Sequence, residues 1–173
     1  MSETTRQPIS RRTVAKGAAW SAPVILGGVA APTYAASGGS PTLSIGGACK
    51  APGKSCKPFE KGYVVTLTIT NDSDKDVWLY VPPTITTEGT DLNLGYAGYD
   101  DGSGDLQKGH IPIPANSRVT IKLNATASNS ANQVFDLTLT FAWGHTPDPA
   151  DGQDHDLVSA TTTIPGTPPD CCK

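Results

Sequence analysis

The sequence predicts an all-β domain, an antiparallel β-sandwich, that follows a separate N-terminal segment of about 35 residues. Several later segments alternate apolar and polar residues with a period of two, the pattern of a strand with one buried face. Turns rich in Gly, Pro, Asn and Asp separate these segments at short intervals, as in sandwiches. No stretch after Ala36 shows a helical apolar period.

The first strands of the domain follow from this pattern. A short strand begins at Leu43 and Ile45 and ends at Gly46-Gly47. The clearest strand covers residues 62–70, with threonines on the face opposite to its apolar residues, which are Tyr63, Val65, Leu67 and Ile69. Asn71 to Asp74 then form a turn, because such side chains bond to their own backbone. Residues 77–81 are apolar on both faces, which predicts a central strand that stops at Pro82-Pro83.

The second half of the domain begins with a long connection. Residues 84–110 are expected to be irregular, to cover the sandwich with Leu92, Leu94, Tyr96 and Tyr99, and to expose an Asp/Gly tip. Two prolines confine residues 111–114 to an edge strand or a lead-in. Strands are then expected around Val119 to Leu123, over residues 135–143 with an apolar face from Phe135 to Trp143, and over residues 157–164. The segment from His145 to Asp156 reads as a plain loop.

The N-terminal segment resembles a twin-arginine export signal. Ser10-Arg11-Arg12-Thr13-Val14-Ala15-Lys16 is similar to the motif Ser-Arg-Arg-x-Phe-Leu-Lys, with Lys16 at the expected offset. The uncharged residues 17–35 follow, and Thr33 and Ala35 provide small residues for a cleavage site. The amino-acid sequence of this segment resembles export signals of high-GC Gram-positive bacteria. This resemblance implies a secreted or cell-envelope protein, carried by the export translocase, with a removed signal at 1–35 and a mature domain at 36–173.

An uncleaved membrane anchor is the alternative for the uncharged segment, since residues 17–35 are about long enough to span a bilayer. Pro23, Pro32 and the Gly27-Gly28 pair weaken it as a permanent helix. Cys49 lies far beyond this segment, and no Leu stands at the offset of a lipoprotein signal. We therefore expect no stable membrane span once the signal is cleaved.

The domain itself resembles bacterial Ig-like modules of the CARDB and adhesion type. Two segments show this resemblance. Residues 63–77 have the pattern of a strand, an Asn-rich turn and a second strand, and residues 113–121 have the pattern of a proline, a turn and a strand. The resemblance covers about residues 62–143. It implies an Ig-like antiparallel sandwich of about seven strands with a long loop insertion, and it carries over no catalytic residue.

Four cysteines, Cys49, Cys56, Cys171 and Cys172, indicate disulfides in an exported domain. In an Ig-like sandwich the first strand commonly runs parallel to the last. The resemblance thus implies that both cysteines of the first turn are bridged to the tail. A bridge between Cys171 and Cys172 ranks last among the three connectivities, and a metal site of four thiolates is the alternative chemistry.

Charge and motifs exclude several functions. Four of the 13 basic and one of the 16 acidic residues precede residue 36, which leaves the domain a net charge of −6 and makes it a poor nucleic-acid binder. Asp100, Asp101 and Asp105 form a candidate Ca²⁺ loop, although they lack the EF-hand spacing. The three histidines show no ligand spacing, no nucleophile motif appears, and the cluster of Lys50, Lys54, Lys57 and Lys61 reads as a solvated turn.

The sequence thus favours a secreted, non-enzymatic Ig-like module with a structural, adhesive or partner-binding role. We expect it to bind an extracellular protein or glycan and to need no cofactor. One alternative is a carbohydrate- or calcium-binding accessory domain that uses the 84–110 loop with Tyr96, Tyr99 or Trp78. The other is a hydrolase with loop carboxylates. Trp78 and Trp143 are expected in the core or on a sheet face rather than as sugar-stacking platforms.

Overall fold

A computed structural model describes residues 39–53, 56–128 and 132–172 of the 173-residue chain. The predicted export residues Arg11, Arg12 and Lys16 and the cleavage residues Thr33 and Ala35 lie outside the described residues. Their role therefore stays a prediction.

The described residues form three antiparallel sheets and one short 3-10 helix. The bounds are β1 Thr42–Ala51, β2 Gly62–Asn71, β3 Val77–Leu79, β4 Thr84–Glu88, β5 Gly95–Asp100, β6 Ile111–Ile113, β7 Ser117–Thr126, β8 Phe135–Phe141, β9 Trp143–Gly144, η1 Pro149–Asp154 and β10 Val158–Ile164. The sheet orders are β1-β2-β7-β5, β10-β8-β4 and β6-β3-β9. The prediction of an all-β domain is confirmed.

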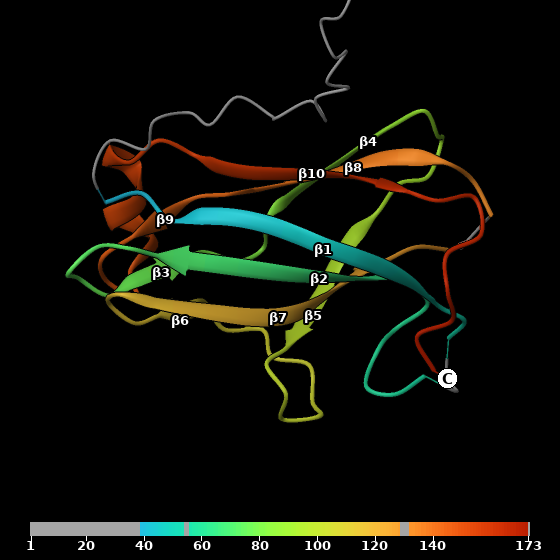
Figure 1. Cartoon of the computed structure of the whole chain (residues 1–173), viewed down its shortest axis with the longest axis horizontal. Coiled ribbons are helices and arrows are strands. Elements are labelled where there is room, and N and C mark those ends of the chain that lie inside the picture. Colours follow the sequence, from blue (N-terminus) through green and yellow to red (C-terminus); the bar gives the residue numbers. More distant parts are fainter. Residues whose placement is uncertain (1–38, 54–55, 129–131, 173) are drawn as a thin grey trace, which may run out of the picture. The chain divides into compact units, whose positions relative to one another are not determined.

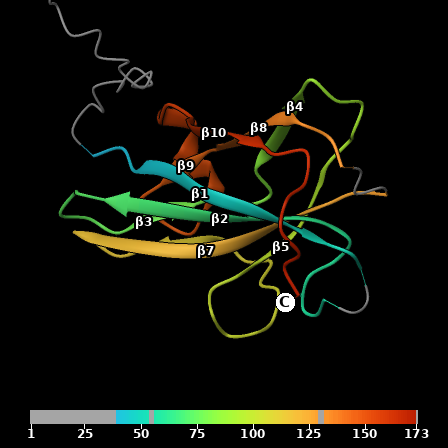
Figure 2. The same ribbon diagram turned by 45° about the vertical axis from the view of Figure 1, so that its right-hand side comes forward.

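The four-stranded sheet is one layer of a sandwich, and the other two sheets lie across from it (Figures 1 and 2). Its centre is the pair β2 and β7, which are in register from Gly62 opposite Thr126 to Asn71 opposite Ser117. Tyr63, Val65, Leu67 and Ile69 are fully buried, as their alternation predicts. The threonines between them lie on the outer face of the sheet and are partly exposed.

The second layer is almost continuous, because only Ala142 separates β8 from β9. The backbone N–H of Tyr80 donates to the carbonyl of Ala142 (2.9 Å), which joins the sheet containing β8 to the sheet containing β3 and β9. All five residues of the predicted apolar face are buried: Phe135, Leu137, Leu139, Phe141 and Trp143. The core is therefore built from the facing sides of the two layers.

The expectation of an irregular 84–110 segment is wrong in part. Residues 84–88 form β4, which pairs with β8, and residues 95–100 form β5, which pairs with β7. Both are edge strands. β4 has a single strongly apolar residue, and β5 contains two glycines and a register shift between Tyr96 and Gly98. These features hide the strand pattern, whereas the exposed 101–105 tip agrees with the expectation.

β1 is longer than expected, since it continues to Ala51 through a register shift between Ile45 and Gly47. This extension brings Lys50 alongside the C-terminal tail, with Lys50 N–H donating to Pro169 (2.7 Å) and Cys171 N–H donating to Lys50 (3.0 Å). The resulting bridge between Lys50 and Asp170 is parallel. The first strand therefore meets the tail in the direction that the Ig-like resemblance implied.

Two disulfides close this end of the domain. Cys49 is bonded to Cys171 and Cys56 to Cys172, with Cα–Cα distances of 5.1 and 5.2 Å. These distances lie in the ordinary range for disulfides. The expectation of disulfides between the first turn and the tail is confirmed, and the alternative of a four-thiolate metal site is wrong because no cysteine is free.

Candidate functional site

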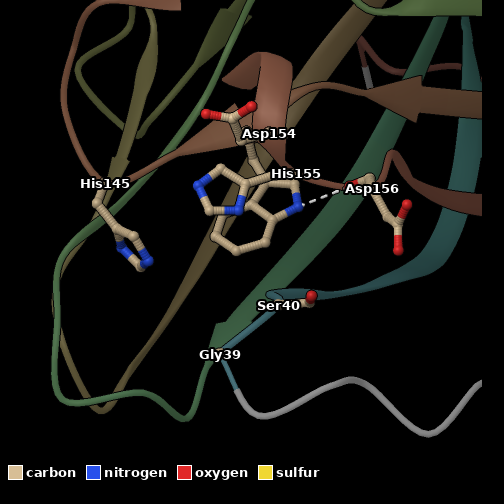
Figure 3. A pocket seen from close by; sticks show the side chains of 7 residues that line it. Gly39, Ser40, His145, Asp154, His155 and Asp156 are labelled. Atoms are coloured by element: carbon tan, nitrogen blue, oxygen red, sulfur yellow. Dashed lines mark hydrogen bonds between the residues drawn. The ribbon is translucent and has the colours of Figure 1, made fainter. Parts of the chain in front are cut away.

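The candidate site is a pocket beside β9, at the end of the sandwich opposite to the C-terminal tail (Figure 1), and Figure 3 shows its lining side chains. Its volume is about 220 Å³, and its lining residues are Gly39, Ser40, Trp143, His145, Asp154, His155 and Asp156. They come from the chain just before β1, from β9 and from the segment that holds η1. Residues far apart in sequence thus meet at one end of the fold.

An aromatic stack forms the pocket wall. Trp143, the last residue of the apolar face, is 3% exposed, and its indole N–H donates to the Asp156 carbonyl (2.8 Å). The His155 ring stacks on the indole with centroids 4.1 Å apart and planes at 24°. His145 meets both rings edge-on, at 5.5 Å from Trp143 and 5.4 Å from His155. Figure 3 shows the His155 ring lying over the indole and the His145 ring to its side.

The Asp151 carboxylate fixes the segment that carries these rings. It accepts the backbone N–H of His145 and that of Thr146, the latter at 3.0 Å. These hydrogen bonds, above all the one from His145, lower the pKa of Asp151 because they stabilise its ionised form. Asp148 caps η1 by accepting the N–H of Ala150 (3.0 Å). The prediction of a plain solvated loop is therefore corrected to an ordered turn.

Two glycines and a tyrosine make this turn possible. A Cβ on Gly144 would collide with the Tyr80 hydroxyl and the Asp151 carboxylate, and a Cβ on Gly152 would collide with the Tyr80 ring. The Tyr80 hydroxyl donates to the Thr146 carbonyl (2.9 Å), and burial raises the pKa of Tyr80. The backbone of the turn consequently packs directly on the side chain of Tyr80, the residue that follows β3.

Sequence reasoning treated the histidines as unrelated loop residues, but the structure brings two of them together. The signal for this contact was the pair of glycines nearby, which allow the chain to fold back onto Trp143. His110 lies apart from the pocket: its ring contacts the ring of Tyr80 at 5.1 Å, and its Nδ1 accepts the Val81 N–H (3.2 Å).

The candidate calcium residues are engaged with their own loop. Asp100 accepts the N–H groups of Gly102 and Gly104, and Asp101 accepts that of Ser103, which together with the Ser103 hydroxyl lowers the pKa of Asp101. Asp105 is exposed. Within the described ranges, no group of three or more His, Cys, Asp or Glu residues is arranged to hold a metal ion.

The aromatic residues that were candidates for sugar stacking do not form an exposed flat surface among the described residues. Tyr99 is 5% exposed and Tyr96 packs against the core, its buried hydroxyl lacking a hydrogen-bond partner among the described residues. Burial raises the pKa of both phenols. Trp78 is partly exposed on β3, opposite Pro112 and Gly144, outside the pocket.

A second, more apolar hollow lies beside the disulfides. Its volume is about 510 Å³, and its lining residues are Pro52, Gly53, Lys57, Phe59, Glu60 and Lys61. Lys61 donates to the Ser128 carbonyl (2.7 Å) and Lys50 to the Asn132 side chain (3.1 Å), so these two ammonium groups are engaged with the neighbouring connection. Lys54 lies outside the described residues.

Comparison with known proteins gives no match to this chain, whether with family models, curated sequences or solved structures. Among the described residues, no helix has the length and hydrophobicity to cross a membrane.

Proposed function

We propose that this chain is an exported Ig-like module that acts by binding an extracellular protein or glycan and not by catalysis. In this proposal the twin-arginine signal at residues 1–35 directs export and is removed, and residues 36–173 are the mature domain. The supporting features are the strand order, the two disulfides and the rigid pocket at the opposite end.

The strand order supports an Ig-like topology. Constant-type Ig domains place strands A, B, E and D in one sheet and C, F and G in the other. Here the order β1-β2-β7-β5 corresponds to A-B-E-D. If β8 and β9 are taken as one strand, and β3 and β4 as another, the order β10-β8-β4 corresponds to G-F-C. This grouping gives the seven strands expected from the resemblance, with β6 added at an edge.

The disulfides carry the proposal of export. Stable disulfides form in oxidising compartments outside the cytoplasm and are rare inside it. Both bridges tie the first turn of the domain to its tail, with sequence separations of 122 and 116 residues. An all-β domain stabilised in this way fits a protein that works beyond the cell membrane.

The export test replaces Arg11 and Arg12 by lysine in the full chain. We expect the precursor to stay inside the cell, whereas the matched substitution Arg118→Lys in β7 leaves secretion unchanged. N-terminal sequencing of the secreted protein should begin at Ala36. Unchanged secretion of the double variant, or a secreted chain that still starts at Met1 or Ser2, argues against the removed twin-arginine signal.

Three assays on the secreted protein distinguish the proposed binding role from the accessory-domain and hydrolase alternatives. A glycan array and a calcium titration by calorimetry test the accessory-domain alternative, and substitution of the loop aspartates with a substrate panel tests the hydrolase alternative. Turnover that is lost on substituting Asp100, Asp101 or Asp105 contradicts the non-enzymatic proposal.

A further inference from the structure

We propose that the outer face of the sheet β10-β8-β4 binds the surface of ice. This face lines neither pocket, and the inference goes beyond the proposed binding of a protein or glycan. It assigns the face a ligand class, an uncharged lattice of hydrogen-bonded water molecules. The observation that carries it is a regular grid of hydroxyl groups on three adjacent strands.

The alternation of side chains places these hydroxyls on one face. In β4, β8 and β10 every second side chain points away from the core and is exposed or partly exposed. Glu88 on β4 and Asp136 on β8 are the acidic residues among them. The others all carry a hydroxyl group and are here called the hydroxyl grid: Thr84 and Thr86 on β4, Thr138 and Thr140 on β8, and Ser159, Thr161 and Thr163 on β10.

The strands are aligned so that the hydroxyls form rows across the sheet. Thr138 on the central strand β8 lies opposite Thr86 of β4 and Thr161 of β10. The next row repeats this arrangement with Thr140, Thr84 and Ser159. Both pairings run without a register shift. Because neighbouring strands lie about 4.8 Å apart and alternate residues of one strand about 6.7 Å apart, the grid has two fixed, nearly perpendicular repeats.

These two repeats are close to the spacings of oxygen atoms on the prism faces of ice. A row of hydroxyls with this spacing holds water molecules at positions that continue the crystal. Such water-mediated hydrogen bonds are nearly as favourable as direct ones. Each hydroxyl offers one donor and two acceptor positions to the water layer, and the threonine methyl groups add apolar contact at the same spacing. The grid therefore has the chemistry and the period of an ice-binding surface.

Internal hydrogen bonds hold the grid in place before ice is present. The hydroxyl oxygens of Thr138 and Thr161 lie 2.8 Å apart, and the Thr163 hydroxyl donates to the Asp136 carboxylate (2.6 Å). Threonine is also stiff at χ1, because its Cβ is branched. Since preformed sites lose less freedom on binding, these side chains present a fixed pattern at little entropic cost.

The charge of the face complements ice better than it complements a protein or a sugar. Glu88 lies opposite Asp136, so the carboxylates share one row at an end of the grid, and the rows of Thr138 and Thr140 are uncharged. No basic or aromatic side chain occurs among the outward residues of β4, β8 and β10. Protein interfaces are enriched in aromatic residues and arginine, and sugar rings stack on aromatic faces. An uncharged grid fits a lattice that offers no ionic partner.

The outer face of the four-stranded sheet is the comparison that the molecule itself provides. It also carries threonines, among them Thr68 on β2 and Thr120 on β7, whose hydroxyl oxygens lie 3.1 Å apart. On β7, however, the exposed residues Arg118 and Lys122 flank Thr120. Both edge strands of this sheet also contain a register shift. The two faces share threonines and differ in charge and regularity, so only the hydroxyl grid fits a lattice.

The size of the grid sets the size of the expected effect. Neighbouring strands of a sheet are rotated by about 20–25° relative to one another, so the fit to a flat crystal face is confined to these three short strands. We therefore expect adsorption that slows the recrystallisation of ice and not a large depression of the freezing point.

The test is ice-affinity partitioning of the purified, disulfide-bonded protein. Ice is grown slowly from a dilute solution, which excludes ordinary solutes and incorporates proteins that adsorb to the crystal. We expect the parent chain to be enriched in the ice fraction several-fold over Thr138→Lys, which places a long charged side chain in the centre of the grid. Thr68→Lys is the matched control and should partition as the parent does, because Thr68 is also a partly buried threonine on a central strand with a threonine partner.

Thr161→Lys repeats the test at an exposed position on an edge strand, so a folding defect of Thr138→Lys in urea unfolding does not decide the outcome. Microscopy of a frozen sucrose solution is the second readout, in which ice crystals should stay smaller with the parent and Thr68→Lys than with either grid variant. Equal partitioning of the parent and Thr161→Lys, or an equal loss in Thr68→Lys, overturns the proposal. Retention on insoluble cellulose or chitin that Thr161→Lys abolishes, without enrichment in ice, also overturns it, because the face then binds a glycan.

Discussion

At the end of the sandwich that holds the C-terminal tail (Figure 1), two disulfides join β1 and its following turn to that tail. The opposite end closes through hydrogen bonds, ring stacking and close backbone packing, with no disulfide among the described residues. The covalent end is basic at Lys50, Lys57 and Lys61. The non-covalent end is rich in aspartate and carries the pocket. The two ends are therefore held by different interactions, covalent bonds at one and hydrogen bonds to the Asp151 carboxylate at the other.

The largest effect should come from removing the covalent clamp. Deleting residues 171–173 eliminates both bridges, and loss of a native disulfide from a small secreted domain costs about 2–5 kcal/mol. We expect the free energy of unfolding in urea to fall by at least this amount while the core strands β2, β7 and β8 still fold. The His145 and His155 NMR signals should not move.

Tryptic mapping of the unreduced parent protein is the control for that deletion. It should link the peptides of Cys49 and Cys56 to that of Cys171 and Cys172. A peptide in which Cys49 is joined to Cys56 would show that the two ends of the chain are independent.

A smaller effect should come from opening the pocket end by Gly144→Ala. The new methyl group meets Tyr80 and Asp151, and overpacking of this kind costs about 1–3 kcal/mol. The measurement is again urea unfolding, with the imidazole NMR signals as a local probe. Gly109→Ala is the matched control, since its Cβ has no atom within 4 Å. If Gly144→Ala has the same free energy of unfolding as Gly109→Ala, the turn accommodates the methyl group without cost and the expectation is wrong.

The smallest effect, and one that depends on pH, is expected for Asp151→Asn. The pKa of Asp151 is lowered in the folded state, so its ionised form stabilises the fold above the unfolded value of about 3.9 and this contribution is lost as pH falls through the folded-state pKa. The variant should have a lower urea midpoint than the parent at pH 7, and the difference should shrink below about pH 4. Asp74→Asn removes the same charge outside the pocket and is the matched control. A difference between Asp151→Asn and the parent chain that does not change with pH would mean that Asp151 acts through its shape and hydrogen bonds and not through its charge.

The sequence predicted the regular parts of this fold well, for identifiable reasons. β2 and β8 alternate strictly, so their buried faces were evident from Tyr63 to Ile69 and from Phe135 to Phe141. β4 and β5 were missed because edge strands need few apolar residues, and because a bulge at Gly98 breaks the alternation.

The candidate site was hidden for a different reason. Its two histidines are ten residues apart, and their segment folds onto Trp143 through the hydrogen bonds of Asp151 and the close contact of Gly144 and Gly152 with Tyr80. That contact joins elements more than 60 residues apart, which no local pattern reports. The Ig-like resemblance implied that both cysteines of the first turn are bridged to the tail, but it left open which of Cys171 and Cys172 each one joins.

The bridge between Cys49 and Cys171 also sets how the domain bears tension. A pull applied between Ser40 and Cys172 runs along β1 to Cys49 and crosses directly to Cys171 through the sulfur atoms. Residues 50–170 lie outside this covalent load path. Such a pull can lengthen the chain only by peeling β1 from Thr42 as far as Cys49, because the disulfide keeps the residues between Cys49 and Cys171 out of the loaded chain.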